Sequence, residues 1–150
     1  MNNIKKRVLI TGVTGMVGSH LVDYLLDNTD WLIYGMCRWR SPLNNVSHLL
    51  DLANQSNRLF FLEGDLLDSF SLANVVNESK PDFIFHLAAQ THVGYSLYNP
   101  YETVLDNTIS TMNVLEATRK YDISRLIHAG SSEIFGDPTN TSIRQGTIKV

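Results

Sequence analysis

Residues 7–18 read RVLITGVTGMVG, and this segment decides how the rest of the 150-residue sequence is interpreted. Its first residues are mostly branched and apolar, as in a buried strand, and glycines follow at positions 12, 15 and 18. The apolar residues of 17–26 then recur at helical spacing. The segment predicts a strand that turns sharply, through glycine, into a helix.

Four more runs share the composition of the first strand, and none alternates between apolar and polar residues. Continuous apolar runs are typical of parallel strands with both faces covered by helices. Segments with helical apolar spacing separate the runs, around 46–50, 72–76 and 101–121. The sequence predicts an α/β fold, a Rossmann-like doubly wound parallel sheet with right-handed crossovers. The five predicted strands are 7–11, 31–37, 58–63, 82–87 and 125–130.

The overall composition excludes several classes of protein. With 12 Lys and Arg against 15 Asp and Glu, the net charge of −3 leaves no basic excess for nucleic acid. No apolar run is long enough for a membrane span or a secretory signal. The single cysteine, Cys37, cannot form an intrachain disulfide, which favours a reducing compartment and a cytoplasmic location. The five histidines lack metal-ligand spacing, so we expect no metal site, and we expect His86 and His128 to be hydrogen-bonded on strands.

The glycine loop has the composition of a dinucleotide site. The three glycines suit a sharp turn, a close approach of backbone to phosphate, and tight packing of helix on sheet. The free N–H groups at the start of the following helix attract a pyrophosphate without any basic side chain. A purely structural strand-to-helix turn is the alternative. The predicted cofactor-binding residues of this loop are Gly12, Thr14, Gly15, Met16, Val17 and Gly18.

The residues that follow the second strand bear on the choice of cofactor. NAD-dependent enzymes usually place a carboxylate there to bind the ribose hydroxyls. This sequence instead has Arg38, with Arg40 close by, and two guanidinium groups suit the 2′-phosphate of NADP. NADP is therefore predicted in preference to NAD, and the alternative is a solvated strand end.

Further motifs resemble those of the extended short-chain dehydrogenase/reductase family over nearly all of residues 7–136. They are Gly64-Asp65-Leu66, Leu87-Ala88-Ala89-Gln90, Asn107, and the segment 130–136. The resemblance implies that the cofactor is also bound by Asp65, Leu66, Leu87, Ala88 and Ala89. It implies that Gln90 and Ser96 contact substrate, although Ser96 is also placed to cap a helix before Pro100.

Within that family, the residues most resemble nucleotide-sugar enzymes, and GDP-mannose 4,6-dehydratases in particular. The segments 37–41, 89–93 and 131–133 carry this resemblance, with Trp39 and Ser131 as departures from the usual residues. It implies a GDP-mannose substrate that is oxidised at C4, loses water across C5 and C6, and regains the hydride at C6. Glu133 is then the base at C5, Ser131 binds the C4 oxygen, and Ser132 assists at C6. The alternative is that the serines cap a turn and Glu133 is solvated.

The family's tyrosine, with a lysine four residues later, does not occur in this sequence. We therefore expect a dinucleotide-binding domain over 1–136, with 137–150 beginning the connection to a further part that holds this motif. The chain alone is expected to be inactive, and the complete enzyme to be a homo-oligomer. The helix over 101–121 resembles a dimer-packing helix of the family, although its apolar stripe would equally serve the core. A 4-epimerase, a 4-keto-sugar reductase and a noncatalytic dinucleotide-binding module remain alternatives.

Overall fold

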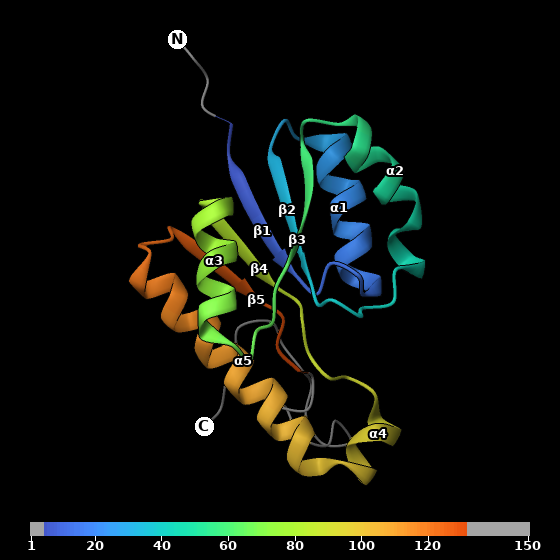
Figure 1. The fold of residues 1–150 in the computed structure, drawn as a ribbon, viewed down its shortest axis with the longest axis vertical. Coiled ribbons are helices and arrows are strands. Elements are labelled where there is room, and N and C mark those ends of the chain that lie inside the picture. Colours follow the sequence, from blue (N-terminus) through green and yellow to red (C-terminus); the bar gives the residue numbers. More distant parts are fainter. Residues whose placement is uncertain (1–4, 132–150) are drawn as a thin grey trace, which may run out of the picture.

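The computed structural model describes residues 5–131, which form five strands and six helical segments (Figure 1). The strands are β1 (Arg7–Thr11), β2 (Leu32–Cys37), β3 (Leu59–Glu63), β4 (Phe83–His86) and β5 (Arg125–His128). The helices are α1 (Met16–Asn28), the 3-10 turn η1 (Asn44–Val46), α2 (Ser47–Gln55), α3 (Ser69–Ser79), α4 (Val93–Tyr98) and α5 (Pro100–Lys120). Residues 1–4 and 132–150 lie outside the described residues. They include Ser132, Glu133 and the whole of the predicted connection, 137–150.

All five strands are parallel, in the order β3-β2-β1-β4-β5. Helices α1 and α2 cover one face of the sheet, and α3 and α5 cover the other (Figure 1). Each face has its own apolar core, with Leu9 and Ile84 on the α3 and α5 side and Ile10 and Ile33 on the α1 and α2 side. The predicted doubly wound parallel sheet is confirmed, and it explains why the strands are apolar on both faces.

Chain order reverses between β1 and β4, because β2 and β3 lie on one side of β1 and the later strands lie on the other. The loops that leave β1 and β4 therefore run to opposite faces of the sheet and open a crevice at the carboxyl ends of these strands. Ligands of open α/β sheets bind at such a crevice. The topology thus places the glycine loop, which follows β1, at the expected binding position.

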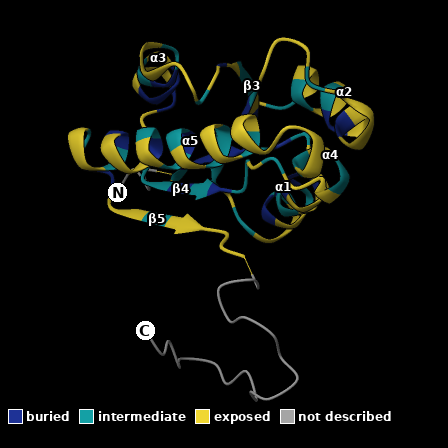
Figure 2. Ribbon diagram, turned by 90° about the horizontal axis from the view of Figure 1, so that it is seen from below, coloured by how far each residue is buried: buried dark blue, intermediate teal, exposed yellow. Residues whose placement is uncertain are grey.

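Helix α5 packs on the sheet through a face that its apolar stripe does not predict. Its buried residues are Ser110, Val114 and Ala117, whereas Met112 and Leu115 of the stripe are 56% and 52% exposed. Figure 2 shows the outward side of α5, and strand β5, as largely exposed. The interpretation of the stripe as part of the core is therefore wrong. The buried face of α5 instead consists of one serine, one valine and one alanine.

The short helix α4 has no counterpart among the predicted elements. Its N-cap is His92, whose Nδ1 accepts the backbone N–H of Tyr95 at 3.0 Å. Ser96 lies inside this helix and donates its hydroxyl to the carbonyl of Val93 at 2.7 Å, and Asn99 is the N-cap of α5. The interpretation of Ser96 as a helix cap is therefore wrong.

The described residues contain neither a membrane-spanning helix nor a cluster of metal ligands. Over residues 5–131, no helix combines the length and the apolar character that crossing a bilayer requires. In the same part of the chain, no three His, Cys, Asp or Glu side chains come together as ligands for a metal ion.

Candidate functional site

A cleft of about 450 Å³ opens at the carboxyl ends of β1, β2, β3 and β4. This volume is in the range of small-molecule binding sites. The residues proposed for the cofactor come together here from four loops that are distant in sequence. Those that line the cleft are Gly12, Thr14, Gly15, Met16, Val17, Gly18, Arg38, Asp65, Leu66, Leu87, Ala88 and Ala89, with Gln90 beside them.

The glycine loop turns sharply where it leaves β1. Gly12 has φ +73°, a conformation that residues with a Cβ rarely adopt. A Cβ on Gly12 would also lie 2.7 Å from the backbone N of Ala88, and one on Gly18 would lie 2.8 Å from Cα of Val13. The sharp turn and the tight helix packing predicted for the first and third glycines are thus confirmed.

The start of α1 faces the cleft. Its N-cap is Gly15, whose extended backbone carries no side chain to occupy the helix terminus. Met16, Val17 and Gly18 form the first turn, and all three line the cleft. The helix dipole and the N–H groups of this turn therefore favour an anion in the cleft.

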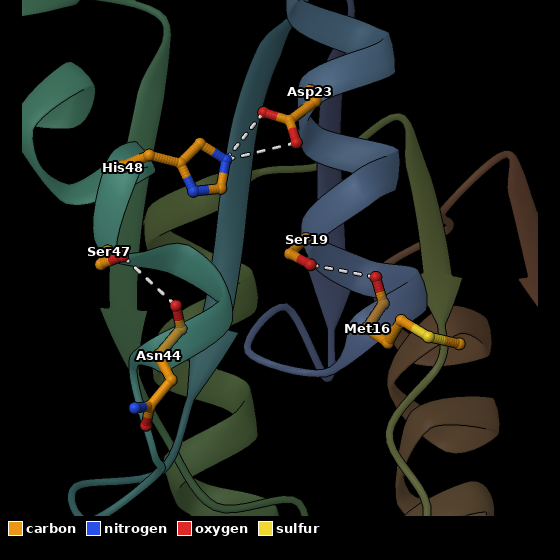
Figure 3. A network of polar contacts seen from close by, with 6 residues as sticks. All are labelled: Met16, Ser19, Asp23, Asn44, Ser47 and His48. Carbon is orange, nitrogen blue, oxygen red and sulfur yellow. Dashed lines mark hydrogen bonds and ion pairs between the residues drawn. The ribbon is translucent and has the colours of Figure 1, made fainter.

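The loop and α1 are supported from outside by the segment that contains η1 and α2. Asn45 donates its side-chain N–H to the carbonyl of Thr14 at 2.9 Å. Next to it, Nε2 of His48 lies 3.1 Å and 3.3 Å from the two carboxylate oxygens of Asp23 on α1 (Figure 3). Within α1, the hydroxyl of Ser19 donates to the carbonyl of Met16 at 3.0 Å. The first of these contacts holds the glycine loop, the second joins α2 to α1, and the third lies within the first turns of α1.

Beyond β2, the cleft continues into a second hollow that contains both arginines singled out in the sequence. Arg38 borders the cleft and the hollow, whereas Arg40 borders only the hollow, together with Trp39. Within residues 5–131, neither guanidinium group makes a hydrogen bond or an ion pair. Glu63 and Asp65 are on the same rim, so a phosphate here would meet positive and negative groups.

Cys37 lies at the end of β2 and lines the cleft. Burial raises the pKa of its thiol, and the nearby carboxylate of Glu63 raises it further. A raised pKa keeps the thiol protonated at neutral pH, and the nucleophile of cysteine chemistry is the thiolate. Cys37 therefore lines the cleft without acting as a reactive thiolate.

His86, at the end of β4, is 1% exposed and has both ring nitrogens engaged. Its Nδ1 lies 2.8 Å from the hydroxyl oxygen of Thr11, and its Nε2 lies 3.4 Å from that of Thr111. The Thr111 hydroxyl donates to the carbonyl of Asn107, and the Thr11 hydroxyl accepts the N–H of Ala88. This network fits a neutral imidazole that carries its proton on Nε2.

Burial, and then the positive potential of His128, lower the pKa of His86 from 6.5 to about 4. The two rings stack with their centroids 5.1 Å apart. His86 is thus hydrogen-bonded on its strand, as expected, and it links β1 and β4 to α5. His128 is exposed and its ring makes no hydrogen bond within residues 5–131, so the same expectation is wrong for it.

The residues implicated in substrate binding and catalysis are only partly described. The side-chain amide of Gln90 is engaged with the backbone of His92, donating to its carbonyl and accepting its N–H. Ser131 is exposed and follows β5 at the carboxyl end of the sheet. Neither Ser96 nor Ser131 borders the cleft.

Helix α5 contributes three cleft residues that were not assigned to the site from the sequence, although Asn107 is one of the residues that carry the family resemblance. Asp106, Asn107 and Ser110 all line the cleft. Their spacing of one and three residues places them on one polar side of a helix. This spacing is the sequence feature that indicates a shared position.

Comparisons with known proteins agree with this geometry. A family model described as GDP-mannose 4,6 dehydratase matches residues 9–148. A GDP-mannose 4,6-dehydratase of Vibrio cholerae is 35% identical over 150 residues, which cover 96% of this chain and 40% of that protein. The chain therefore spans about two-fifths of the length of the curated relatives it matches.

Solved structures share the fold. The UDP-glucose 4-epimerase of Thermus thermophilus, in complex with NAD, matches with a TM-score of 0.68 and 29% identity, over 80% of this chain and 36% of that chain. The UDP-glucose 4-epimerase of Bifidobacterium longum, in complex with NAD⁺ and UDP, matches with a TM-score of 0.81 over 95% of this chain and 42% of that chain. Its 23% identity makes it a likeness of fold alone.

The family match runs through all five strands, the glycine loop and the cleft-lining part of α5. The resemblance first seen in short motifs therefore extends over nearly the whole sequence. On this basis the chain belongs to the GDP-mannose 4,6 dehydratase family.

Proposed function

We propose that this chain is the NADP-binding portion of an enzyme that converts GDP-mannose to its 4-keto-6-deoxy product. The observation that carries the proposal is the cleft itself. It has an uncapped helix N-terminus at its centre and two unpaired arginines at the end that follows β2. Family membership supports a nucleotide-sugar substrate, and the NAD named in related solved structures supports a nicotinamide dinucleotide.

The residues of the cleft fit such a cofactor. The open backbone at Gly15 and the first turn of α1 suit a pyrophosphate, since a Cβ at Gly15 would meet only the carbonyl of Gly12, at 3.2 Å. The guanidinium groups of Arg38 and Arg40 suit a 2′-phosphate, and their positive charge compensates for Glu63 on the same rim. When bound, the nicotinamide would take up a hydride from the sugar and return it.

The chemistry on the sugar is assigned to the residues that follow β5. Oxidation at C4 acidifies the proton at C5, and the carboxylate of Glu133 removes it as a general base. Ser131 donates a hydrogen bond to the C4 oxygen, and Ser132 assists proton delivery to the C6 hydroxyl as it leaves as water. Support comes from the family and from Ser131, which follows β5 at the carboxyl end of the sheet.

Two further features belong to the proposal. A homo-oligomeric enzyme is supported by apolar side chains that α5 exposes, among them Tyr101, Val104, Met112 and Leu115. A cytoplasmic location is supported by the single cysteine, which has no intrachain partner.

The experiment that tests the function is incubation of the complete protein with GDP-mannose and NADP⁺. We expect a product that is lighter by one water and carries a 4-keto group, with no net consumption of cofactor, because the hydride returns to C6. Mass spectrometry and the carbonyl resonance in ¹³C NMR measure both features. A 4-epimer of unchanged mass would instead identify an epimerase, the activity named in the related solved structures. Product formed only from a ketosugar with NADPH would identify a reductase.

Arg38→Asp tests the proposed choice of cofactor. The substitution replaces a partner of the 2′-phosphate with a repelling charge at the border of the cleft. We expect NADP⁺ binding to weaken by about 100-fold, and NAD⁺ binding by less than about fivefold, since one charge-assisted hydrogen bond is worth about 1.5–3 kcal/mol. Calorimetric titration with the two cofactors measures the difference.

Arg125→Asp is the matched control. It makes the same change of charge at an exposed arginine that begins β5, at the opposite end of the sheet from the cleft. We expect it to leave both affinities within twofold of the unsubstituted protein. Equal losses of NADP⁺ and NAD⁺ binding in the Arg38 variant would show that Arg38 does not discriminate between the two cofactors.

A further inference from the structure

Helix α5 holds the loop that follows β4 through a single asparagine. Oδ1 of Asn107 accepts the backbone N–H of Gln90 at 2.7 Å, and Nδ2 donates to the carbonyl of the same residue at 3.0 Å. One side-chain amide thus satisfies both backbone groups of Gln90. The loop it holds contains Ala88 and Ala89, which line the cleft.

A second asparagine on the same helix holds the loop that follows β3. Nδ2 of Asn113 donates to the carbonyl of Leu66 at 2.7 Å, across 47 positions of sequence. Asp65, Leu66 and Leu67 all line the cleft, whereas Asn113 does not. Asn113 therefore reaches the cleft only through the backbone that it holds.

The two asparagines are six residues apart, which separates them by about 9 Å along the helix and about 120° around it. They consequently reach different loops from one rigid body. Val114 and Ala117, the neighbouring residues of α5, are buried in the core on this face of the sheet. Both loops are thus held by a helix whose own position is fixed by its packing in the core.

We infer that Asn113 is a positioning residue for the adenosine half of the cofactor, and that Asn107 is its counterpart for the nicotinamide half. The inference rests on the proposed function, because it needs a dinucleotide in the cleft. In a sheet of order β3-β2-β1-β4-β5, with the pyrophosphate at the glycine loop, the adenosine half lies over β2 and β3. The other half then lies over β4, beside Gln90.

The two positions respond differently to a half-length ligand. The probes are NADP⁺ and adenosine 2′,5′-bisphosphate, or NAD⁺ and AMP if the protein binds NAD⁺ more tightly. Asn113→Ala should weaken the half-length and the full ligand alike, by about tenfold, the effect of one lost hydrogen bond. Asn107→Ala should weaken the full ligand by about tenfold and leave the half-length ligand within twofold. Calorimetric titration measures all four affinities.

Asn113→Asp separates hydrogen bonding from packing. Aspartate has nearly the shape of asparagine, but its carboxylate would face the carbonyl of Leu66, an acceptor against an acceptor. We expect it to weaken the half-length ligand at least as much as Asn113→Ala does. Affinity equal to that of the unsubstituted protein would show that Asn113 only fills space, and would overturn the inference. Asn77→Ala, at an exposed asparagine of α3, is the control and should change neither affinity.

A measurement on the unsubstituted protein does not depend on whether the variants fold. Hydrogen exchange with the half-length ligand should slow in residues 64–68 and leave residues 88–91 unchanged, whereas the full dinucleotide should slow both segments. Protection of residues 88–91 by the half-length ligand, or an Asn113→Ala protein that binds it with unchanged affinity, would overturn the inference. Failure of the unsubstituted protein to bind either ligand would overturn the proposed function as well.

Discussion

Gly12→Ala is expected to lower the free energy of unfolding by about 3 kcal/mol and to abolish dinucleotide binding. Its methyl group would lie 2.7–2.9 Å from backbone atoms of Leu87 and Ala88, which cannot move without displacing the end of β4. The positive φ adds about 1–2 kcal/mol for a residue with a Cβ, and crowding in a packed site adds about 1–3 kcal/mol. Urea denaturation followed by circular dichroism measures the loss of stability.

Two other glycines serve as controls for this prediction. Among the described residues, a Cβ at Gly130 would have no heavy atom within 4 Å, so Gly130→Ala should leave both stability and binding unchanged. A Cβ at Gly15, which lines the cleft, would meet only the carbonyl of Gly12, at 3.2 Å. Gly15→Ala should therefore cost less than about 1 kcal/mol of stability and still weaken dinucleotide binding strongly. A Gly12→Ala protein as stable as the Gly130 variant would contradict the close approach of the two loops.

The central strands β1 and β2 could be predicted from the sequence because burial on both faces requires apolar residues at consecutive positions, whereas β5 is largely exposed. Each run, such as Ile33 to Cys37 in β2, is apolar at consecutive positions, and the structure places its strand within one or two residues of the expected ends. The glycine loop could also be predicted from the sequence, since the turn at Gly12 and the packing at Gly18 each require a residue without a side chain. These features are local, so the sequence displays them directly.

For helix α5, the sequence predicts the helix but not the face that packs on the sheet. Periodicity identified the helix, but its more apolar stripe faces outward and its small residues, Ser110 and Ala117, face the sheet. Apolar spacing identifies the more apolar side of a helix, and in α5 that side is not the one that packs on the sheet. Helix α4, with six residues and a histidine cap, is too short for any periodic signal.

The residues that position the cleft were the hardest to foresee. Asn113 and Leu66 are joined across 47 positions, and Thr11 and His86 across 75. The sequence around Asn113 or Thr11 does not identify the residue that each one contacts, because the packing of α5 and the position of β4 in the sheet determine it. Polar residues on the buried side of a helix predict some hydrogen bond, and only the fold determines which one.

His86 should make the stability of the protein depend on pH between 6.5 and 4. Its pKa is about 4 in the folded chain and 6.5 as an ordinary histidine, so in this range the unfolded chain binds a proton that the folded chain does not. Stability therefore rises with pH across the range. The contribution of His86 is fully present above pH 6.5, is lost as pH falls towards 4, and amounts to about 3 kcal/mol.

Other groups titrate in the same range, so the prediction is a difference between variants. Asn at position 86 offers Oδ1 to the hydroxyl of Thr11, in place of Nδ1, and cannot take up a proton. We expect the stability of His86→Asn to be lower at pH 7, where the contact with Thr111 is lost, and to fall by about 3 kcal/mol less than that of the unsubstituted protein between pH 7 and pH 4. Urea titrations at a series of pH values measure both slopes.

His20→Asn, which removes an exposed imidazole of α1, is the matched control for the loss of a histidine. Parallel slopes for the His86 variant and the unsubstituted protein would mean that His86 is protonated in the fold. The Thr11 hydroxyl would then have to accept from His86 as well as from Ala88, leaving its own hydrogen without the ring nitrogen as partner. A flatter slope in the His86 variant alone would establish that β1 and β4 are joined beside the cleft through a neutral imidazole.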